Sequence, residues 1–137
     1  MRAIGIILAG GNNKRMHELS NKRAISAMPV AGTFRAIDFS LSNMSNSHIQ
    51  KVAVLTQYNS RSLNQHLSSS KWWDFGRKQG GLYVFTPTIT AEHGDWFRGT
   101  ADALYQNLVF LQSSHEPYVI VTAGDGVYKL DYNKVLE

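Results

Sequence analysis

The sequence predicts an α/β protein with a doubly wound, mostly parallel sheet and helices on both of its faces. Short apolar runs alternate along the chain with segments whose apolar residues recur at helical spacing, which is typical of parallel sheets. The apolar runs are continuous, as expected for strands that are buried on both faces. Because ligands of such sheets bind at the carboxyl ends of the strands, functional side chains are expected there.

Four apolar runs are predicted to be strands. The first run ends in two glycines, Gly10 and Gly11, and the last is followed closely by Asp125. The third run stops at Pro87, which has no N–H to donate to a neighbouring strand. The predicted strands cover residues 4–8, 52–56, 82–86 and 118–122.

Three segments between these runs are predicted to be helices. The first has Ile37, Leu41 and Met44 on one face, the second begins at the capping residue Ser60, and the third has three leucines on one face. The chain ends soon after the fourth strand, so we expect a truncated domain with exposed strand edges that favour self-association. The predicted helices cover residues 35–44, 60–67 and 100–111, and the predicted long loops cover residues 68–81 and 89–99.

Composition excludes several classes of protein. The 137 residues contain no cysteine, which excludes disulfides and cysteine-ligated zinc and agrees with a cytoplasmic location. No apolar run approaches the roughly 18 residues of a membrane span, and the first run is too short for a signal peptide. The net charge is +4, which is either ordinary surface charge or attraction for an anionic ligand. Neither a membrane nor a nucleic acid is an expected partner, because no nucleic-acid-binding signature is present.

The segment after the first strand has the composition of a phosphate-binding turn. Gly10 and Gly11 let backbone N–H groups approach a phosphate, and Lys14 and Arg15 add positive charge. Asn13 tolerates a left-handed backbone almost as well as glycine does. The P-loop pattern and the dinucleotide-binding pattern are both absent. An ordinary turn after a strand therefore remains the alternative.

Two further positions carry candidate chemistry. Asp125 follows the fourth strand, where a carboxylate either holds Mg²⁺ against phosphate oxygens or caps a turn. Thr100 either caps the third helix or, together with Arg98, faces a phosphate or sugar. The five histidines lack metal-ligand spacing and are expected to be structural or surface residues. Trp72 and Trp73 are expected to pack rather than to stack on a base.

Six short segments, taken together in order, identify a protein family more specifically than any one of them does. In order they read ILAGG, NKRA, FRAIDFSLSN, VLTQY, WFRGTADALYQN and GDGVYKLDY, from about residue 4 to the end of the chain. Together they closely resemble the glucose-1-phosphate adenylyltransferase family. The resemblance implies a Rossmann-like nucleotide-diphospho-sugar transferase fold, of which residues 1–137 are the N-terminal part. The rest of that domain and a C-terminal β-helix domain would follow.

The resemblance also implies an activity and a set of functional residues. The family converts ATP and glucose-1-phosphate to ADP-glucose and pyrophosphate with Mg²⁺, for glycogen synthesis. Arg15 and Asp125 would be catalytic, and Asp125 would bind the metal. Lys22 would bind a phosphorylated effector, and the loops bearing Gln57 and Trp96 are linked to activation. The nucleotide would be bound by Leu8, Ala9, Gly10, Gly11, Arg15, Gln57, Gly99, Thr100 and Ala101.

The sequence departs from catalytic members of the family at four positions. Those members read roughly GGxGxRL and then AKPAVP, and an alignment without gaps puts Ile25 where they have a lysine near the triphosphate. Asn13 replaces a glycine, Phe97 replaces a tyrosine, and Gly126 replaces the histidine of GDHIY. Nucleotidyl transfer builds negative charge on phosphate oxygens, which a fixed cation stabilises. Losing one such group commonly lowers the rate by on the order of 10²–10³, about 3–4 kcal/mol.

These departures favour a regulatory subunit over a catalytic one. Some bacteria pair a catalytic subunit of this family with a degenerate paralogue that modulates the hetero-oligomer, and this chain resembles the paralogue. The alternative is an active sugar-1-phosphate nucleotidyltransferase with altered phosphate contacts, in which Lys14 or Lys22 substitutes for the missing lysine. A third hypothesis is a nucleotidyltransferase that acts on another sugar or base. The GTADA and NKRA segments argue against it.

Overall fold

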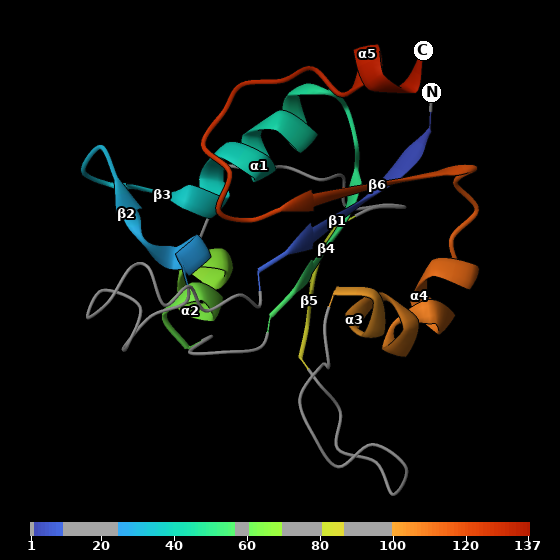
Figure 1. Ribbon diagram of the computed structural model, residues 1–137, viewed down its shortest axis with the longest axis horizontal. Helices are drawn as coiled ribbons and strands as arrows, with labels where there is room; N and C mark the ends of the chain where they lie inside the picture. The colour runs from blue at the N-terminus through green and yellow to red at the C-terminus, as the bar shows by residue number, and fades with distance from the viewer. Residues whose placement is uncertain (1, 10–24, 57–60, 70–80, 87–99) are drawn as a thin grey trace, which may run out of the picture.

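The computed structural model describes residues 2–9, 25–56, 61–69, 81–86 and 100–137 (Figure 1). These residues form a four-stranded sheet and a separate two-stranded hairpin. The strands are β1 (Ala3–Leu8), β2 (Pro29–Val30), β3 (Phe34–Arg35), β4 (Lys51–Leu55), β5 (Gly81–Phe85) and β6 (Tyr118–Ala123). The helices are η2 (Ile25–Ala27), α1 (Ala36–Asn46), α2 (Arg61–Ser69), α3 (Thr100–Gln106), α4 (Leu108–Gln112) and α5 (Asn133–Leu136).

The main sheet is entirely parallel, with the strand order β5-β4-β1-β6. The last residue of β1, Leu8, is in register with Leu55 of β4 and with Ala123 of β6. Leu55 is in turn in register with Phe85 of β5. All four strands therefore end at the same edge of the sheet, which is where ligands of such sheets bind.

Helices cover both faces of the sheet, as the sequence predicts (Figure 1). On one face, α1 and α2 contribute Ile37, Leu41 and Leu63 to a core that also contains Ile7 and Val54. These five side chains are completely buried. The helical spacing of Ile37, Leu41 and Met44 explains this packing, because residues three and four apart lie on one face of a helix.

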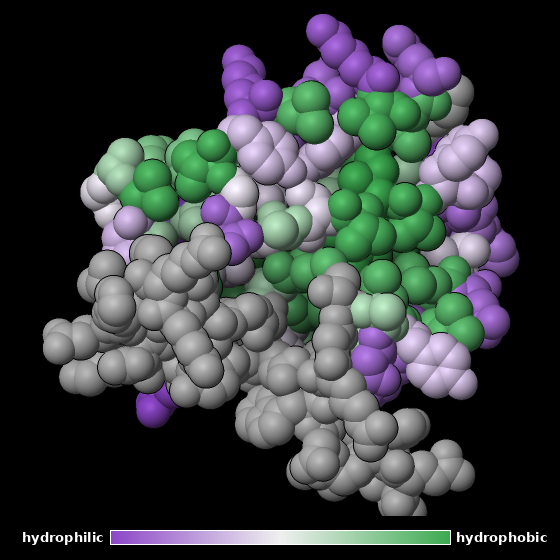
Figure 2. All heavy atoms as spheres, in the orientation of Figure 1, coloured by the Kyte–Doolittle hydropathy of each residue, from purple (hydrophilic) through white to green (hydrophobic). Residues whose placement is uncertain are grey.

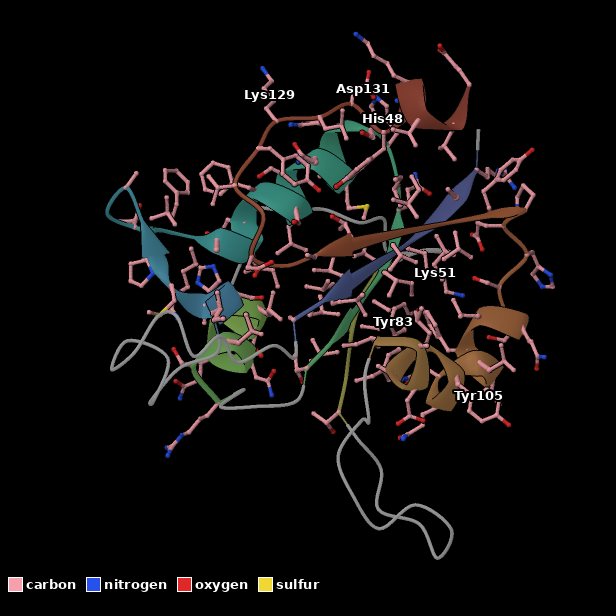
Figure 3. All side chains as sticks on the ribbon, viewed as in Figure 1. His48, Lys51, Tyr83, Tyr105, Lys129 and Asp131 are labelled. Carbon is pink, nitrogen blue, oxygen red and sulfur yellow. The ribbon has the colours of Figure 1, made fainter. Side chains whose placement is uncertain are left out.

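The second face is covered by α3 and α4. Its core consists of Ile6, Ala53, Leu55 and Ala103, with Phe110 packed against it. Phe110 lies edge-on to Phe85 with 4.9 Å between ring centroids, and the Lys51 ammonium lies 4.8 Å from the Phe110 ring centroid. Figure 3 shows Lys51 and Tyr83 on the side of the sheet where α3 and α4 lie.

The predicted fourth strand is less buried than its apolar sequence suggests. In β6 only Ile120 and Thr122 are buried, whereas Tyr118, Val119 and Val121 are 45–48% exposed. These side chains are exposed because β6 lies at an edge of the described sheet and one of its faces is not covered by α3 and α4. Figure 2 shows apolar side chains gathered over this part of the molecule.

Other differences from the predicted elements are local. The single helix predicted over residues 100–111 is two helices, since Asn107 separates α3 from α4 with φ −106° and ψ 19°. The η2 turn, the β2–β3 hairpin and α5 have no counterpart among the predicted elements. The adjacent residues Trp72 and Trp73, which were predicted to pack, lie outside the described residues. Among the helices that the structure describes, none has both the length and the apolar character needed to cross a membrane.

Candidate functional site

The candidate site lies where the strands of the main sheet end. The backbone hydrogen bonding continues one residue beyond β1, β4 and β6: Ala9 N donates to Leu55 O at 2.9 Å, and Gly124 N donates to Leu8 O at 2.9 Å. Thr56 N donates to the carbonyl oxygen at the end of β5, at 2.8 Å. These bonds hold the residues that follow β1, β4 and β6 side by side. Leu8 and Ala9 thereby lie near Asp125, which follows Gly124 directly.

The η2 turn packs against this edge at Gly124. A Cβ atom added to Gly124 would lie 2.6 Å from Ser26 Oγ and 3.2 Å from Ile7 Cγ2, so a side chain at position 124 requires the neighbours to move. Ser26 is buried, and Ile25 beside it is half-buried. The turn is closed by Met28 N, which donates to Ile25 O at 2.9 Å. The fold therefore brings residue 25 close to the carboxyl end of β6.

A polar network ties η2 to both helices on this face. Asp38 accepts a hydrogen bond from Arg35 N at 2.9 Å, which satisfies a free N–H before the first turn of α1. The other Asp38 oxygen lies 2.6 Å from His66 Nε2 of α2. Arg35 Nη1 donates to Ser62 Oγ at 2.7 Å and to Ala27 O at 3.3 Å. The network fixes the turn that carries Ile25 relative to α1 and α2.

The sequence did not reveal this network, although it predicted a structural or surface role for the histidines. His66 and Asp38 are 28 residues apart, and Arg35 and Ser62 are 27 apart, so no local spacing marks them. The FRAID segment is the only hint, because an aspartate in the first turn of a helix commonly accepts a backbone N–H. His66 confirms the structural interpretation for one histidine.

Asp125 lies in the turn after β6 with its side chain exposed. The next residue, Gly126, stands where the resemblance predicts a histidine. A Cβ atom added there would lie 2.6 Å from Cε1 of Tyr128, so the Tyr128 ring occupies the space beside position 126. A side chain at position 126 therefore requires the Tyr128 ring to move.

The Tyr128 hydroxyl belongs to a small polar cluster behind this turn. It lies 2.7 Å from Thr122 Oγ1 and 3.3 Å from the Tyr132 hydroxyl. Burial, together with the hydrogen bond to Tyr128, raises the pKa of Tyr132 to about 12. The Tyr132 hydroxyl therefore stays protonated at neutral pH and serves as a hydrogen-bonding group.

Asp125, the predicted magnesium ligand, is a carboxylate, which is a type of ligand that Mg²⁺ prefers. It supplies only one carboxylate. Among the residues that the structure describes, no three His, Cys, Asp or Glu side chains are grouped so that they could hold a metal. Mg²⁺ is commonly held by one or two carboxylates, with water and substrate phosphates as its other ligands. Asp125 is suited to a metal that is shared with a nucleotide.

The described residues include only part of the predicted site. Thr100 begins α3 and Ala101 is exposed in its first turn, near the second face of the sheet. The remaining predicted site residues lie outside the described ranges, so their roles stay predictions. They are Gly10, Gly11, Arg15, Lys22, Gln57, Trp96 and Gly99.

Comparisons with known proteins agree with this architecture. The model of a family described as nucleotidyl transferase matches residues 4–137. The chain is 43% identical over 134 residues to a glucose-1-phosphate adenylyltransferase of Clostridium novyi, 46% identical to that of Clostridium kluyveri and 44% identical to that of Thermosipho africanus. The aligned residues make up 98% of this chain and 35%, 35% and 32% of the three relatives. The chain thus spans about a third of the length of these curated relatives.

Proposed function

Because the chain belongs to the nucleotidyl transferase family, we propose that it is part of a glucose-1-phosphate adenylyltransferase subunit, the activity for which its relatives are named. The subunit would take part in making ADP-glucose and pyrophosphate from ATP and glucose-1-phosphate, for glycogen synthesis. A cytoplasmic location belongs to the same proposal, since the chain has no cysteine.

The proposed role of this subunit is regulatory, in a hetero-oligomer with a catalytic paralogue. One observation carries this proposal: residue 25, next to the strand ends, is isoleucine. Its neighbour Ser26 contacts the Gly124 region, so a cation at position 25 would be near the site and isoleucine brings none. Fixed cations stabilise the negative charge that develops during nucleotidyl transfer, and removing one lowers the rate by on the order of 10²–10³.

Nucleotide binding is proposed to persist without fast turnover. The proposed phosphate-binding residues after β1 and the carboxylate of Asp125 would be retained whatever residue stands at position 25. Mg²⁺ held by Asp125 would neutralise phosphate charge, while Arg15 would contribute a positive side chain from the turn. Lys22 would recognise a phosphorylated effector. Gln57 and Trp96 would belong to loops that respond to it.

An active nucleotidyltransferase with altered phosphate contacts is the alternative proposal. The observation that favours it is the positive charge near position 25 in the sequence. Lys14 and Lys22 are both available to replace the missing lysine. The two proposals predict different turnover rates for this subunit when it is measured without the catalytic paralogue.

The test is ADP-glucose formation by the native protein, alone and mixed with its catalytic paralogue. On the regulatory proposal, the protein alone is on the order of 10²–10³ slower than the paralogue, and its addition changes the paralogue's rate or effector response. Ile25→Lys restores a cation and is expected to raise the activity of the protein alone by at least about tenfold.

Ile25→Met is the matched control, because methionine is of similar size but has no charge. It is expected to leave the low activity unchanged. A normal rate for the unmodified protein alone, roughly 1–10³ s⁻¹, would contradict the regulatory role and favour the alternative.

A further inference from the structure

One face of α1 carries three buried polar side chains where a core-facing helix usually has apolar ones. Ser40, Asn43 and Ser47 are 0%, 4% and 3% exposed. Their spacing of three and four residues aligns them in a stripe along α1 that continues to its C-cap, Ser47. Buried polar groups are unfavourable unless they are hydrogen-bonded, so a stripe of them calls for partners along its whole length.

The partners all belong to the segment that begins at the end of β6. Ser40 Oγ donates to Ala123 O at 2.9 Å. Asn43 Nδ2 donates to Tyr128 O at 3.0 Å, and Asn43 Oδ1 accepts from Leu130 N at 3.1 Å. These three bonds join side chains of one helix to backbone atoms more than 80 residues away.

Ser47 completes the stripe at the end of α1. Its Oγ accepts a hydrogen bond from Tyr132 N at 2.8 Å and donates to Asp131 Oδ1 at 3.3 Å. Hydrogen bonds from Asn133 and Ser47 lower the pKa of the Asp131 carboxyl, so this group stays ionised as an acceptor. Figure 1 shows the segment running from β6 back across α1 to α5, and Figure 3 shows Lys129, Asp131 and His48 in this region.

The segment between β6 and α5 has no strand or helix of its own to fix its backbone. Residues 124–132 lie in neither a strand nor a helix, and most of their side chains are exposed. Its position is held by the stripe of α1, together with the hydroxyl contacts of Tyr128 with Thr122 and Tyr132. The contacts lie on both sides of Asp125: Ala123 precedes it by two residues, and Tyr128 follows it by three.

We infer that Ser40, Asn43 and Ser47 are positioning residues that fix the backbone on both sides of Asp125, so that its carboxylate is held in place for a metal ion. This inference rests on the proposed metal-binding role of Asp125. The physical reason is preorganisation: a carboxylate on a restrained backbone binds a cation without first losing conformational freedom. Groups that hydrogen-bond a metal ligand directly commonly contribute 10–100-fold to metal affinity, and about tenfold, the lower end, is expected for residues that restrain the backbone beside the ligand.

Asn43 is the central residue of the stripe. Its amide both donates and accepts, and it spans two backbone groups, Tyr128 O and Leu130 N. Asn43→Ala removes both bonds and leaves Tyr128 O and Leu130 N without this partner. Ser40→Ala and Ser47→Ala each remove one hydroxyl and are milder. All three substitutions leave Asp125 itself unchanged.

The test uses the native protein with Mn²⁺ as the probe in the presence of ATP, and two measurements. The affinity for Mn²⁺ is followed by electron paramagnetic resonance, and the backbone restraint is followed by hydrogen exchange at the Leu130 and Tyr132 amides. Asn43→Ala is expected to weaken Mn²⁺ binding about tenfold and to speed exchange at Leu130. Ser47→Ala is expected to speed exchange at Tyr132 and to weaken Mn²⁺ binding less.

Ser42→Ala is the matched control on the same helix. Ser42 is only half-buried, and the structure records no side-chain hydrogen bond for it among the described residues. The control is expected to change neither measurement. Asp125→Asn is the reference variant, and its Mn²⁺ affinity is expected to fall at least as far as that of Asn43→Ala.

The outcomes separate the inference from the function on which it rests. In one outcome, Asp125→Asn weakens Mn²⁺ binding, whereas Asn43→Ala and Ser47→Ala speed amide exchange and leave the Mn²⁺ affinity unchanged. The positioning role is then wrong, and the metal role of Asp125 stands. If Asp125→Asn leaves the affinity unchanged, both the metal role and the positioning role are overturned. Loss of affinity in both Asp125→Asn and Asn43→Ala, with Ser42→Ala unaffected, supports the inference.

Discussion

At the scale of single residues, Gly124 determines how closely η2 approaches the sheet. The Ser26 side chain leaves no room for a methyl group at position 124, since an added Cβ atom would lie 2.6 Å from Ser26 Oγ. Ser26 is buried and belongs to the turn that also carries Ile25. Glycine is therefore needed here for close approach rather than for an unusual backbone angle. Glycine at position 124 therefore lets the η2 turn pack close to the sheet, and this packing determines where residue 25 lies.

Gly124→Ala is expected to lower the free energy of unfolding by about 1–3 kcal/mol, because the methyl group is forced into a filled space. Combining it with Ser26→Ala removes the nearest atom, so the double variant is expected to lose less than the sum of the single variants. Urea denaturation of the four proteins in this cycle measures the coupling. Additive losses would show that the contact with Ser26 is not what excludes a side chain.

At the scale of elements, the helices and strands with strong periodicity could be predicted, and the short ones could not. The strand at residues 52–56 was found at Lys51–Leu55, and the helix at residues 35–44 was found at Ala36–Asn46. The continuous apolar strands and the regular helical stripe each have a local cause in sequence. By contrast, η2 and the β2–β3 hairpin are three- and two-residue elements, too short for any periodicity.

The break between α3 and α4 shows a second limit of prediction. The leucines at 104, 108 and 111 continue the helical pattern through Asn107, which is why one helix was predicted. The side-chain Nδ2 of Asn107 donates to Ala103 O at 2.8 Å, whereas the backbone N–H of Asn107 donates to Leu104 O at 3.2 Å. The side chain has thus taken the place of the regular helical hydrogen bond, a competition that apolar spacing does not report.

The link between α1 and α2 depends on Asp38, which is 5% exposed. Asp38→Ala is expected to lower the free energy of unfolding by about 2–3 kcal/mol, because it removes the bond from Arg35 N and the contact with His66 Nε2. Asp38→Asn keeps an acceptor for Arg35 N and is expected to cost less. Thermal unfolding of the two variants measures the difference. A loss below about 0.5 kcal/mol for Asp38→Ala would show that the pair contributes little to stability.

At the scale of the whole molecule, the candidate site is assembled from distant parts of the sequence. The sequence alone suggested that Ala9 and Asp125 lie at strand ends, and the strand order places them at neighbouring ends. The anchoring of the segment after Asp125 by α1 was not predicted. In the sequence, Ser40 and Asn43 look like ordinary polar residues of the helix predicted over residues 35–44, and Ser47 lies beyond it. The partners of all three are 83 or more residues away.

The two faces of the sheet also differ in how completely they are covered. Val54 is fully buried under α1 and α2, whereas Val121 is 45% exposed on β6. In the 137-residue chain, Val54→Ala is expected to lower the free energy of unfolding by about 2–3 kcal/mol, and Val121→Ala by less than about 1 kcal/mol. Chemical denaturation of the two variants tests this contrast, in which the same atoms are removed at both positions. Equal losses would show that Val121 is covered by something that the described residues do not include.

The central place of β1 has a consequence for the order in which the fold can form. Of the described strands it is synthesised first, yet its two neighbours are β4 and β6, whose pairing with it ends at Leu55 and Ala123. Pairing over such sequence separations closes long loops and makes folding slow. On the ribosome, the apolar strand β1 has one neighbour missing until β6, which ends at Ala123, has emerged. During that interval its open edge is exposed to other nascent chains, which makes this stage of synthesis prone to aggregation.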